Sequence, residues 1–86
     1  MNSIKFAELT PRYDRRSSFY GKAHLIIHED GKIQLQSYET IVAEYADGKM
    51  KVFGHYSTTT SRHVREFIRQ ITGEDLTVKE IERRYF

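Results

Sequence analysis

The tripeptide Asp-Gly-Lys occurs twice, at residues 30–32 and 47–49, and each copy separates two short runs rich in β-branched and aromatic residues. Asp-Gly between such runs is a strong signal for a tight turn that joins two antiparallel strands. The repeated tripeptide therefore predicts an antiparallel meander, in which four strands follow one another in chain order. The expected strands are residues 23–28, 32–38, 40–46 and 50–56.

The apolar residues around the first turn predict a three-residue loop that ends at Gly31 in a left-handed conformation. This loop pairs Leu25 with Leu35 and Ile27 with Ile33, so that apolar side chains share one face of the sheet. A two-residue loop would shift the register by one residue and place the same side chains opposite glutamines. We therefore expect the longer, bulged turn.

The second turn is predicted as a two-residue loop, residues 47–48. This loop pairs Tyr45 with Met50 on the apolar face. On the other face it places Glu44 opposite Lys51, and opposite charges facing each other across two strands are favourable. The shorter turn is therefore expected here.

Two features of the sheet stay open in the sequence. The centre of the connection at residues 37–40 forms either a turn or a bulge, and this choice decides which face of the sheet carries the helix. Ile26 and Val42 are expected on the second face, covered either by the N-terminal arm or by another copy of the chain. An exposed apolar face there predicts a homodimer.

One amphipathic helix is predicted for residues 61–72, because apolar residues recur there at the i, i+3, i+4 and i+7 spacing of one helical face. The apolar stripe consists of Val64, Phe67, Ile68 and Ile71. The residues outside the stripe are Arg62, Arg65, Glu66 and Arg69. The helix is thus expected to have a buried side and a cationic side. Either Thr60 or Ser61 is the expected N-cap, and Gly73 is expected to end the helix in a left-handed conformation.

The C-terminal residues predict a second, short helix over residues 78–86. Thr77 and Glu80 have the spacing of a capping box, in which each side chain accepts a hydrogen bond from the other residue's backbone N–H. Leu76 and Ile81 have the spacing of the hydrophobic staple that accompanies it. We therefore expect an α+β fold, with the four-stranded sheet packed by one amphipathic helix and followed by the short helix.

The composition limits the kind of protein. The 86 residues support one small domain, with a basic N-terminal arm at residues 1–22, the sheet at residues 23–56, and the two helices. The chain has no cysteine, which excludes disulfides, thiolate metal sites and a cysteine nucleophile. No apolar run has the length of a signal peptide or a membrane span, so we expect a cytoplasmic protein in the host cell, without a membrane partner.

The 14 basic and 12 acidic residues leave a net charge of +2, and the basic excess sits in the arm and the first helix. If the arm folds beside the helix, the two form one cationic face that attracts phosphate groups or an acidic protein surface. The alternative is an ordinary solvated polar face. The candidate residues for binding a partner or phosphate are Arg12, Arg15, Arg16, Lys22, Ser61, Arg62, His63, Arg65 and Arg69.

Catalytic and metal-binding patterns are weak. The hydroxyl-rich run at residues 57–61 precedes a helix N-terminus, where backbone N–H groups favour an anion, but helix capping and turn formation explain the same residues. His63 beside this run is a candidate general base only if the fold brings a hydroxyl to it. His24 and His28 lie on one face of a strand, at a spacing that is awkward for one metal ion. No catalytic residue, metal or cofactor is therefore expected, and the histidines are expected to be exposed polar residues.

Three ordered blocks of the chain carry a resemblance to a known family. They are RRSSFYGKA at residues 15–23, LQSYETIVA at residues 35–43 and YSTTTSRHVREFIRQ at residues 56–70. Together they resemble a family of short uncharacterised proteins encoded by phages and other mobile elements of Gram-positive bacteria, over about residues 12–71. The resemblance implies an accessory factor, such as an inhibitor of bacterial defence of the anti-CRISPR kind, and assigns no activity to any residue.

We therefore expect a non-enzymatic phage accessory protein that binds a host protein or ribonucleoprotein complex. It would inhibit this nucleic-acid-handling complex by occupying its surface. The alternative is direct binding of DNA or RNA through the face of arginine and lysine side chains. A third hypothesis, an enzyme that uses His63 and the hydroxyl run, has the least support because no catalytic motif accompanies them.

Overall fold

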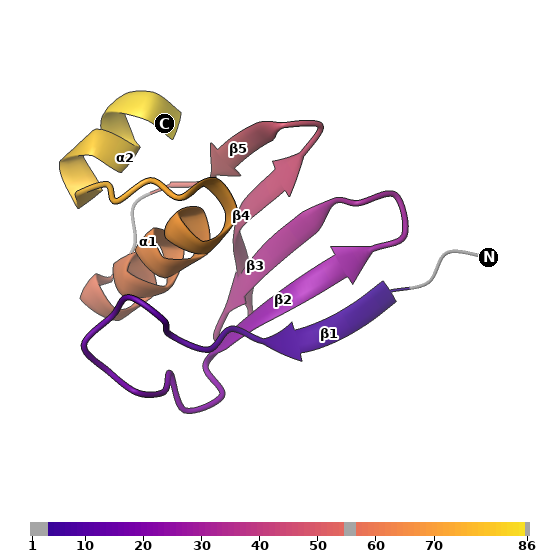
Figure 1. The fold of residues 1–86 in the computed structure, drawn as a ribbon, viewed down its shortest axis with the longest axis horizontal. Helices are drawn as coiled ribbons and strands as arrows, with labels where there is room; N and C mark the ends of the chain where they lie inside the picture. The colour runs from indigo at the N-terminus through magenta and orange to yellow at the C-terminus, as the bar shows by residue number, and fades with distance from the viewer. Residues whose placement is uncertain (1–3, 55–56, 86) are drawn as a thin grey trace.

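The computed structural model describes residues 4–54 and 57–85. It is an α+β fold with one antiparallel sheet of five strands, in the order β1-β2-β3-β4-β5, and two helices (Figure 1). The strands are β1 (Ile4–Glu8), β2 (Ala23–His28), β3 (Ile33–Ser37), β4 (Thr40–Ala46) and β5 (Lys49–Val52). The helices are α1 (Thr58–Thr72) and α2 (Val78–Tyr85).

The prediction of four strands is wrong, because part of the N-terminal arm forms the additional strand β1. It pairs with β2 in antiparallel register, with Ile4 opposite His28 and Glu8 opposite His24. All five residues of β1 are exposed. A strand that is exposed on both faces needs no alternation of apolar and polar residues, and this alternation is the signal from which strands are predicted.

The predicted register of the first hairpin is confirmed. Leu25 lies opposite Leu35, and Ile27 lies opposite Ile33. Gly31 closes the three-residue loop with a φ angle of 94°, in the region that a residue with a side chain rarely adopts. The longer turn therefore forms because it gathers the apolar residues on one face.

The two-residue loop of the second hairpin is also confirmed. Tyr45 lies opposite Met50 and Glu44 lies opposite Lys51. Asp47 and Gly48 have φ angles of 53° and 74°, and two successive positive values define the type I′ turn that Asp-Gly favours.

The connection between β3 and β4 contains both a turn and a bulge. Ser37 pairs with Thr40, so the chain reverses at residues 38–39. Further along, Leu35 pairs with Ala43 but Gln36 pairs with Ile41, which leaves Val42 as an extra residue in β4. The bulge lets both Val42 and Ala43 enter the core, at 1% and 0% exposure. The expectation that Val42 lies on the second face of the sheet is therefore wrong.

Helix α1 begins three residues earlier than predicted. Its N-cap is Ser57, whose Oγ accepts a hydrogen bond from the backbone N–H of Thr60 at 3.2 Å. Neither Thr60 nor Ser61 is the cap, because both lie within the helix. The predicted end is confirmed, since Gly73 adopts a left-handed conformation with a φ angle of 79°.

The capping box of α2 is confirmed. The backbone N–H of Thr77 donates to Glu80 Oε1 at 3.1 Å, and the N–H of Glu80 donates to Thr77 Oγ1 at 3.2 Å. Leu76 and Ile81, the predicted staple residues, are both buried in the core. The last residue of the predicted helix, Phe86, lies outside the described residues, as do residues 55–56 of the fourth predicted strand.

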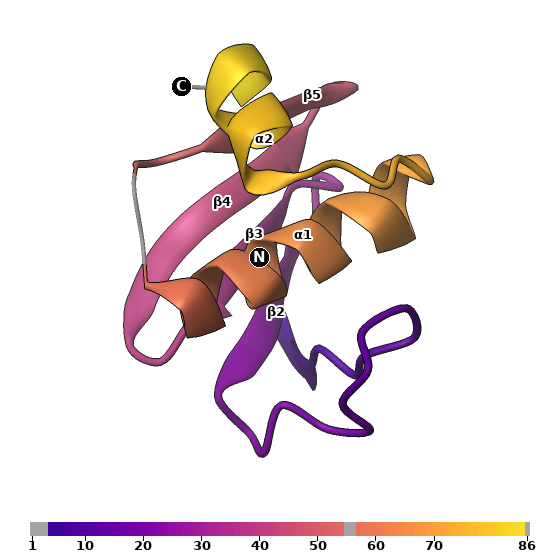
Figure 2. The ribbon, with the colours of Figure 1, turned by 90° about the vertical axis from the view of Figure 1, so that its left-hand side faces the viewer.

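One face of the sheet forms the core with α1, as Figure 2 shows. Val64, Phe67 and Ile68 of α1 are at most 2% exposed, so the predicted apolar stripe faces the sheet. Helix α1 crosses the sheet between α2 and the loop that joins β1 to β2 (Figures 1 and 2). Within the described residues, both helices are too short or too polar to cross a membrane.

Candidate functional site

The loop between β1 and β2 is attached to α1 by one carboxylate. Glu66 is only 3% exposed, and its Oε1 accepts hydrogen bonds from the backbone N–H groups of Tyr13 and Asp14, both at 3.0 Å. Its Oε2 accepts from the N–H of Arg12 at 3.1 Å. A buried carboxylate is stable only where donors replace its lost water. Three successive backbone donors meet this need and fix the loop on the helix.

A second set of contacts reinforces this attachment. Gln70 lies one turn further along α1, and its Nε2 donates to the backbone carbonyl of Thr10 at 2.8 Å. The Cζ atom of Arg69 lies 4.2 Å from the centre of the Tyr13 ring, which is within the range of a cation–π contact. The loop therefore becomes one wall of a groove along α1.

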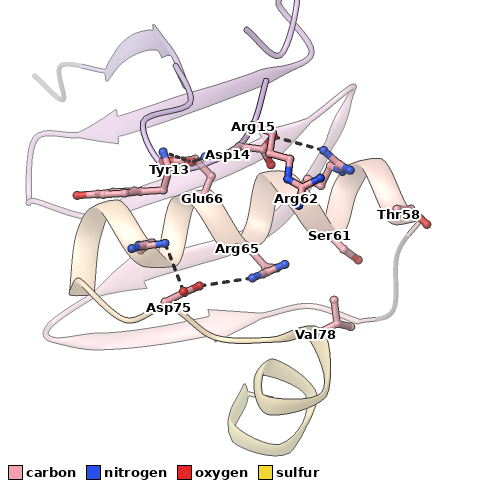
Figure 3. A pocket seen from close by; sticks show the side chains of 11 residues that line it. Tyr13, Asp14, Arg15, Thr58, Ser61, Arg62, Arg65, Glu66, Asp75 and Val78 are labelled. Carbon is pink, nitrogen blue, oxygen red and sulfur yellow. Dashed lines mark hydrogen bonds and ion pairs between the residues drawn. The ribbon is translucent and has the colours of Figure 1, made fainter. Parts of the chain in front are cut away.

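The groove has a volume of about 730 Å³ and runs along the outer side of α1 (Figure 3). The loop at residues 13–15 forms one wall, and Asp75 and Val78 belong to the other. The floor is the polar side of α1. The cationic side chains that line the groove are Arg15 from the loop and Arg62, Arg65 and Arg69 from α1.

Each arginine that α1 contributes to the groove contacts a carboxylate from a wall, as the dashed lines in Figure 3 show. Arg62 Nη1 lies 3.3 Å from Asp14 Oδ1. Asp75 bridges the other two, with its oxygens 3.4 Å from Arg65 Nη2 and 3.4 Å from Arg69 Nη1. The three arginine side chains are 36% to 46% exposed and Asp75 is 59% exposed, whereas Asp14 is only 13% exposed. Ion pairs as exposed as the two at Asp75 contribute about 1 kcal/mol or less. A competing anion can therefore replace Asp75 at little cost in stability.

The fold brings together five of the nine residues predicted to bind a partner. The five that line the groove are Arg15, Ser61, Arg62, Arg65 and Arg69. The four that do not line it are Arg12, Arg16, Lys22 and His63. The first three of these four are exposed elsewhere on the surface, and the fourth is buried.

His63 faces the sheet and is 1% exposed, so the expectation of an exposed polar histidine is wrong for this residue. Its Nδ1 lies 2.8 Å from Ser37 Oγ, which also lies 3.0 Å from Thr60 Oγ1. The ring makes an edge-to-face contact with Phe19, with ring centres 4.6 Å apart. Burial lowers the pKa of His63, although the Asp14 carboxylate opposes this shift. The ring has almost no surface for a substrate to reach, which favours a structural role.

The other two described histidines lie on the face of the sheet opposite α1. His24 and His28 pair with residues of β1, and His28 Nε2 lies 2.7 Å from Gln34 Oε1. Among residues 4–54 and 57–85, no three His, Asp or Glu side chains gather closely enough to hold a metal ion.

Sequence reasoning missed the acidic residues of the groove. In the sequence Glu66 lies between Arg65 and Arg69, where a solvent-exposed charged side chain is the ordinary expectation. Asp14 and Asp75 meet the arginines only through the fold, because 48 positions separate Asp14 from Arg62. The one local signal is Gln70, which lies one helical turn after Glu66 and donates a hydrogen bond from its Nε2 to the Glu66 carboxylate.

A family model described as a family of unknown function, DUF8033, matches residues 7–83. The match extends into α2, beyond the residues that carry the sequence resemblance. Comparisons with curated proteins and with solved structures give no match. Because the family model covers most of the chain, this protein belongs to the DUF8033 family of unknown function.

Proposed function

We propose that this protein is a non-enzymatic accessory protein whose groove along α1 binds an acidic segment of a partner protein. The observation that carries the proposal is the row of Arg62, Arg65 and Arg69, which already holds carboxylates from the walls of the groove. Arginine forks suit carboxylates geometrically, and the two pairs at Asp75 are exposed enough to exchange for external ones. Asp75 thus occupies a position that a carboxylate of the partner would take.

The charge balance of the groove supports a protein partner over a nucleic acid. Its lining has four arginines and three acidic residues, which leaves a surplus of one positive charge. Surfaces that bind DNA or RNA are usually far more positive, because they must neutralise a row of phosphates. Protein interfaces are enriched in arginine and tyrosine, and the half-exposed Tyr13 lies against Arg69 at one wall.

The biological role that we propose is inhibition of a host complex that handles nucleic acid, as an anti-CRISPR-like protein encoded by a phage or mobile element. This part rests on the sequence resemblance. The groove adds a physical constraint, since arginines do not suit the basic channel that holds nucleic acid in such a complex. The protein would instead occupy an acidic surface and block assembly or movement of the complex.

The groove is tested by direct titration of a labelled, glutamate-rich peptide and of a short DNA duplex of the same charge. We expect the peptide to bind and the Arg62→Ala/Arg69→Ala variant to bind it at least about tenfold more weakly. Each charge-assisted hydrogen bond contributes about 1.5–3 kcal/mol, and 1.4 kcal/mol is a factor of ten. The matched control is Arg16→Ala/Arg83→Ala, which removes the same charge from exposed positions outside the groove.

Tighter binding of the duplex, with affinity that falls steeply as salt rises, would favour the nucleic-acid hypothesis instead. Equal losses of affinity for the peptide in the two double variants would show that binding depends on net charge and not on the groove. The inhibitor role is tested separately, by capture of partners from a nuclease-treated bacterial lysate with the wild type and both variants. A partner that the groove variant loses, and whose activity the wild type reduces, is the expected result.

A further inference from the structure

Strand β1 ends the sheet with a free edge. It is the first strand in the sheet order, and no other described strand pairs with its outer side (Figure 1). All five of its residues are exposed, including two large apolar ones, Ile4 at 49% and Phe6 at 70%. A flat edge with exposed apolar residues is a template for pairing with another strand.

The backbone groups that point outward from β1 follow from its pairing with β2. The N–H of Leu9 donates to the carbonyl of Ala23 at 2.9 Å, in line with the register of the two strands. Inward and outward groups alternate along an antiparallel strand. Odd-numbered residues of β1 therefore bond to β2, and the N–H and C=O groups of Ile4, Phe6 and Glu8 point to the free edge.

The opposite edge of the sheet is protected, and β1 is not. Strand β5 carries the exposed Lys49 and Lys51, and α2 packs near it. Lysines and a covering helix are among the usual devices that prevent edge pairing. In β1 the charges of Lys5 and Glu8 cancel, and the strand has neither a proline nor a bulge.

We propose that two copies of this chain associate through β1, in antiparallel register about Phe6, to form one continuous sheet. Phe6 then lies opposite the partner's Phe6, and Ile4 lies opposite the partner's Glu8. This register uses all the outward backbone groups of the strand and forms an aromatic pair across the two-fold axis. A shift of two residues would place Lys5 opposite the partner's Lys5, and like charges in that position repel.

The dimer is expected to be weak and to depend on concentration. Stable protein interfaces bury at least about 1,200 Å² in total, and one pair of five-residue strands buries less. Binding of a peptide in the groove does not require this contact, because the groove lies along α1 and β1 is at the edge of the sheet. The dimer can therefore fail or succeed independently of the proposed function.

Single cysteine variants test the register, because the chain has no cysteine of its own. The Cα atoms of a hydrogen-bonded antiparallel pair lie about 5.5 Å apart, within the range that a disulfide spans. We expect Phe6→Cys to form a covalent dimer under mild oxidation. The matched control is Ile4→Cys, because Ile4 lies on the same strand and face as Phe6. In the proposed register the substituted positions of the two chains would lie four residues apart, about 13 Å along the strands.

The native chain is examined by sedimentation equilibrium over a range of concentrations. Its average mass is expected to rise toward that of a dimer, and Phe6→Glu is expected to remain a monomer with an unchanged unfolding temperature, because Phe6 is 70% exposed. Two results would overturn the proposal. One is equal rates of disulfide formation in Phe6→Cys and Ile4→Cys, and the other is an association that Phe6→Glu does not reduce.

Discussion

His63 places an ionisable ring between the sheet and α1, where Ser37 and Thr60 complete its hydrogen-bonded network. Desolvation is the main reason that its pKa lies below the ordinary 6.5, with Asp14 acting in the opposite direction. The unfolded chain therefore takes up a proton at His63 at a higher pH than the folded chain does. The neutral ring contributes stability that is fully present above pH 6.5 and is lost as the pH falls through the folded-state pKa.

We predict that the free energy of unfolding falls when the pH is lowered below 6.5, and that part of this fall is absent in His63→Gln. The measurement is urea unfolding of both proteins above and below that pH. Because all other titratable groups are shared, the difference between the two proteins isolates His63. A pH dependence that is the same in both would contradict the assignment.

At the scale of the element, α1 depends on a cap that lies outside its apolar pattern. Ser57 Oγ satisfies the N–H of Thr60, one of the donors that the first turn leaves without a partner within the helix. The hydroxyl run offers several residues that are chemically able to cap, and only the fold selects among them.

We predict that Ser57→Ala lowers the free energy of unfolding by about 1 kcal/mol, the usual loss for removal of an N-cap. Ser61→Ala, which changes the same side chain one turn further on, is expected to change it by less than about 0.5 kcal/mol. Urea unfolding of the two variants beside the wild type gives the comparison. A larger effect at Ser61 would place the start of the helix where the apolar stripe suggests it.

The elements differ in how far the sequence predicts them, and the reason is physical. Both Asp-Gly hairpins and the capping box of α2 depend on residues a few positions apart, so local pattern specifies them. Strand β1 pairs across the long loop before Ala23 and has no buried face, and the short alternation of Ile4, Lys5 and Phe6 does not by itself distinguish it from the rest of the arm. The bulge at Val42 arises because the core takes two consecutive residues of β4, which alternation alone does not predict.

For the whole molecule, the arginine-bearing side of the groove could be predicted and its walls could not. Helical periodicity places Arg62, Arg65 and Arg69 on the side away from the apolar stripe, and the structure places them in the groove. The walls come from other parts of the chain, so their acidic residues could not be assigned. Without Asp14 and Asp75 the sequence suggests a cationic face, whereas the folded groove is nearly neutral.

We predict that Asp75→Asn increases the affinity for the glutamate-rich peptide several-fold, because it frees Arg65 and Arg69 from a competing carboxylate. The loss of stability is expected to be within about 1 kcal/mol, as for other exposed ion pairs. Asp47→Asn is the control, since it changes the net charge equally in a distant turn where asparagine suits the positive φ angle. Titration of the wild type and both variants with the peptide gives the ratio of their affinities. Weaker binding by Asp75→Asn would mean that this carboxylate helps to build the groove.

The attachment of the first loop by Glu66 has a consequence for the order of folding. Its three hydrogen bonds join residues 52 to 54 positions apart, whereas the two Asp-Gly hairpins close over a few residues. Contacts between distant residues carry the larger loop-closure entropy, so we expect them to form late. A nascent chain would thus have its hairpins before it has its groove. Recognition through the groove would then be confined to molecules that have completed folding.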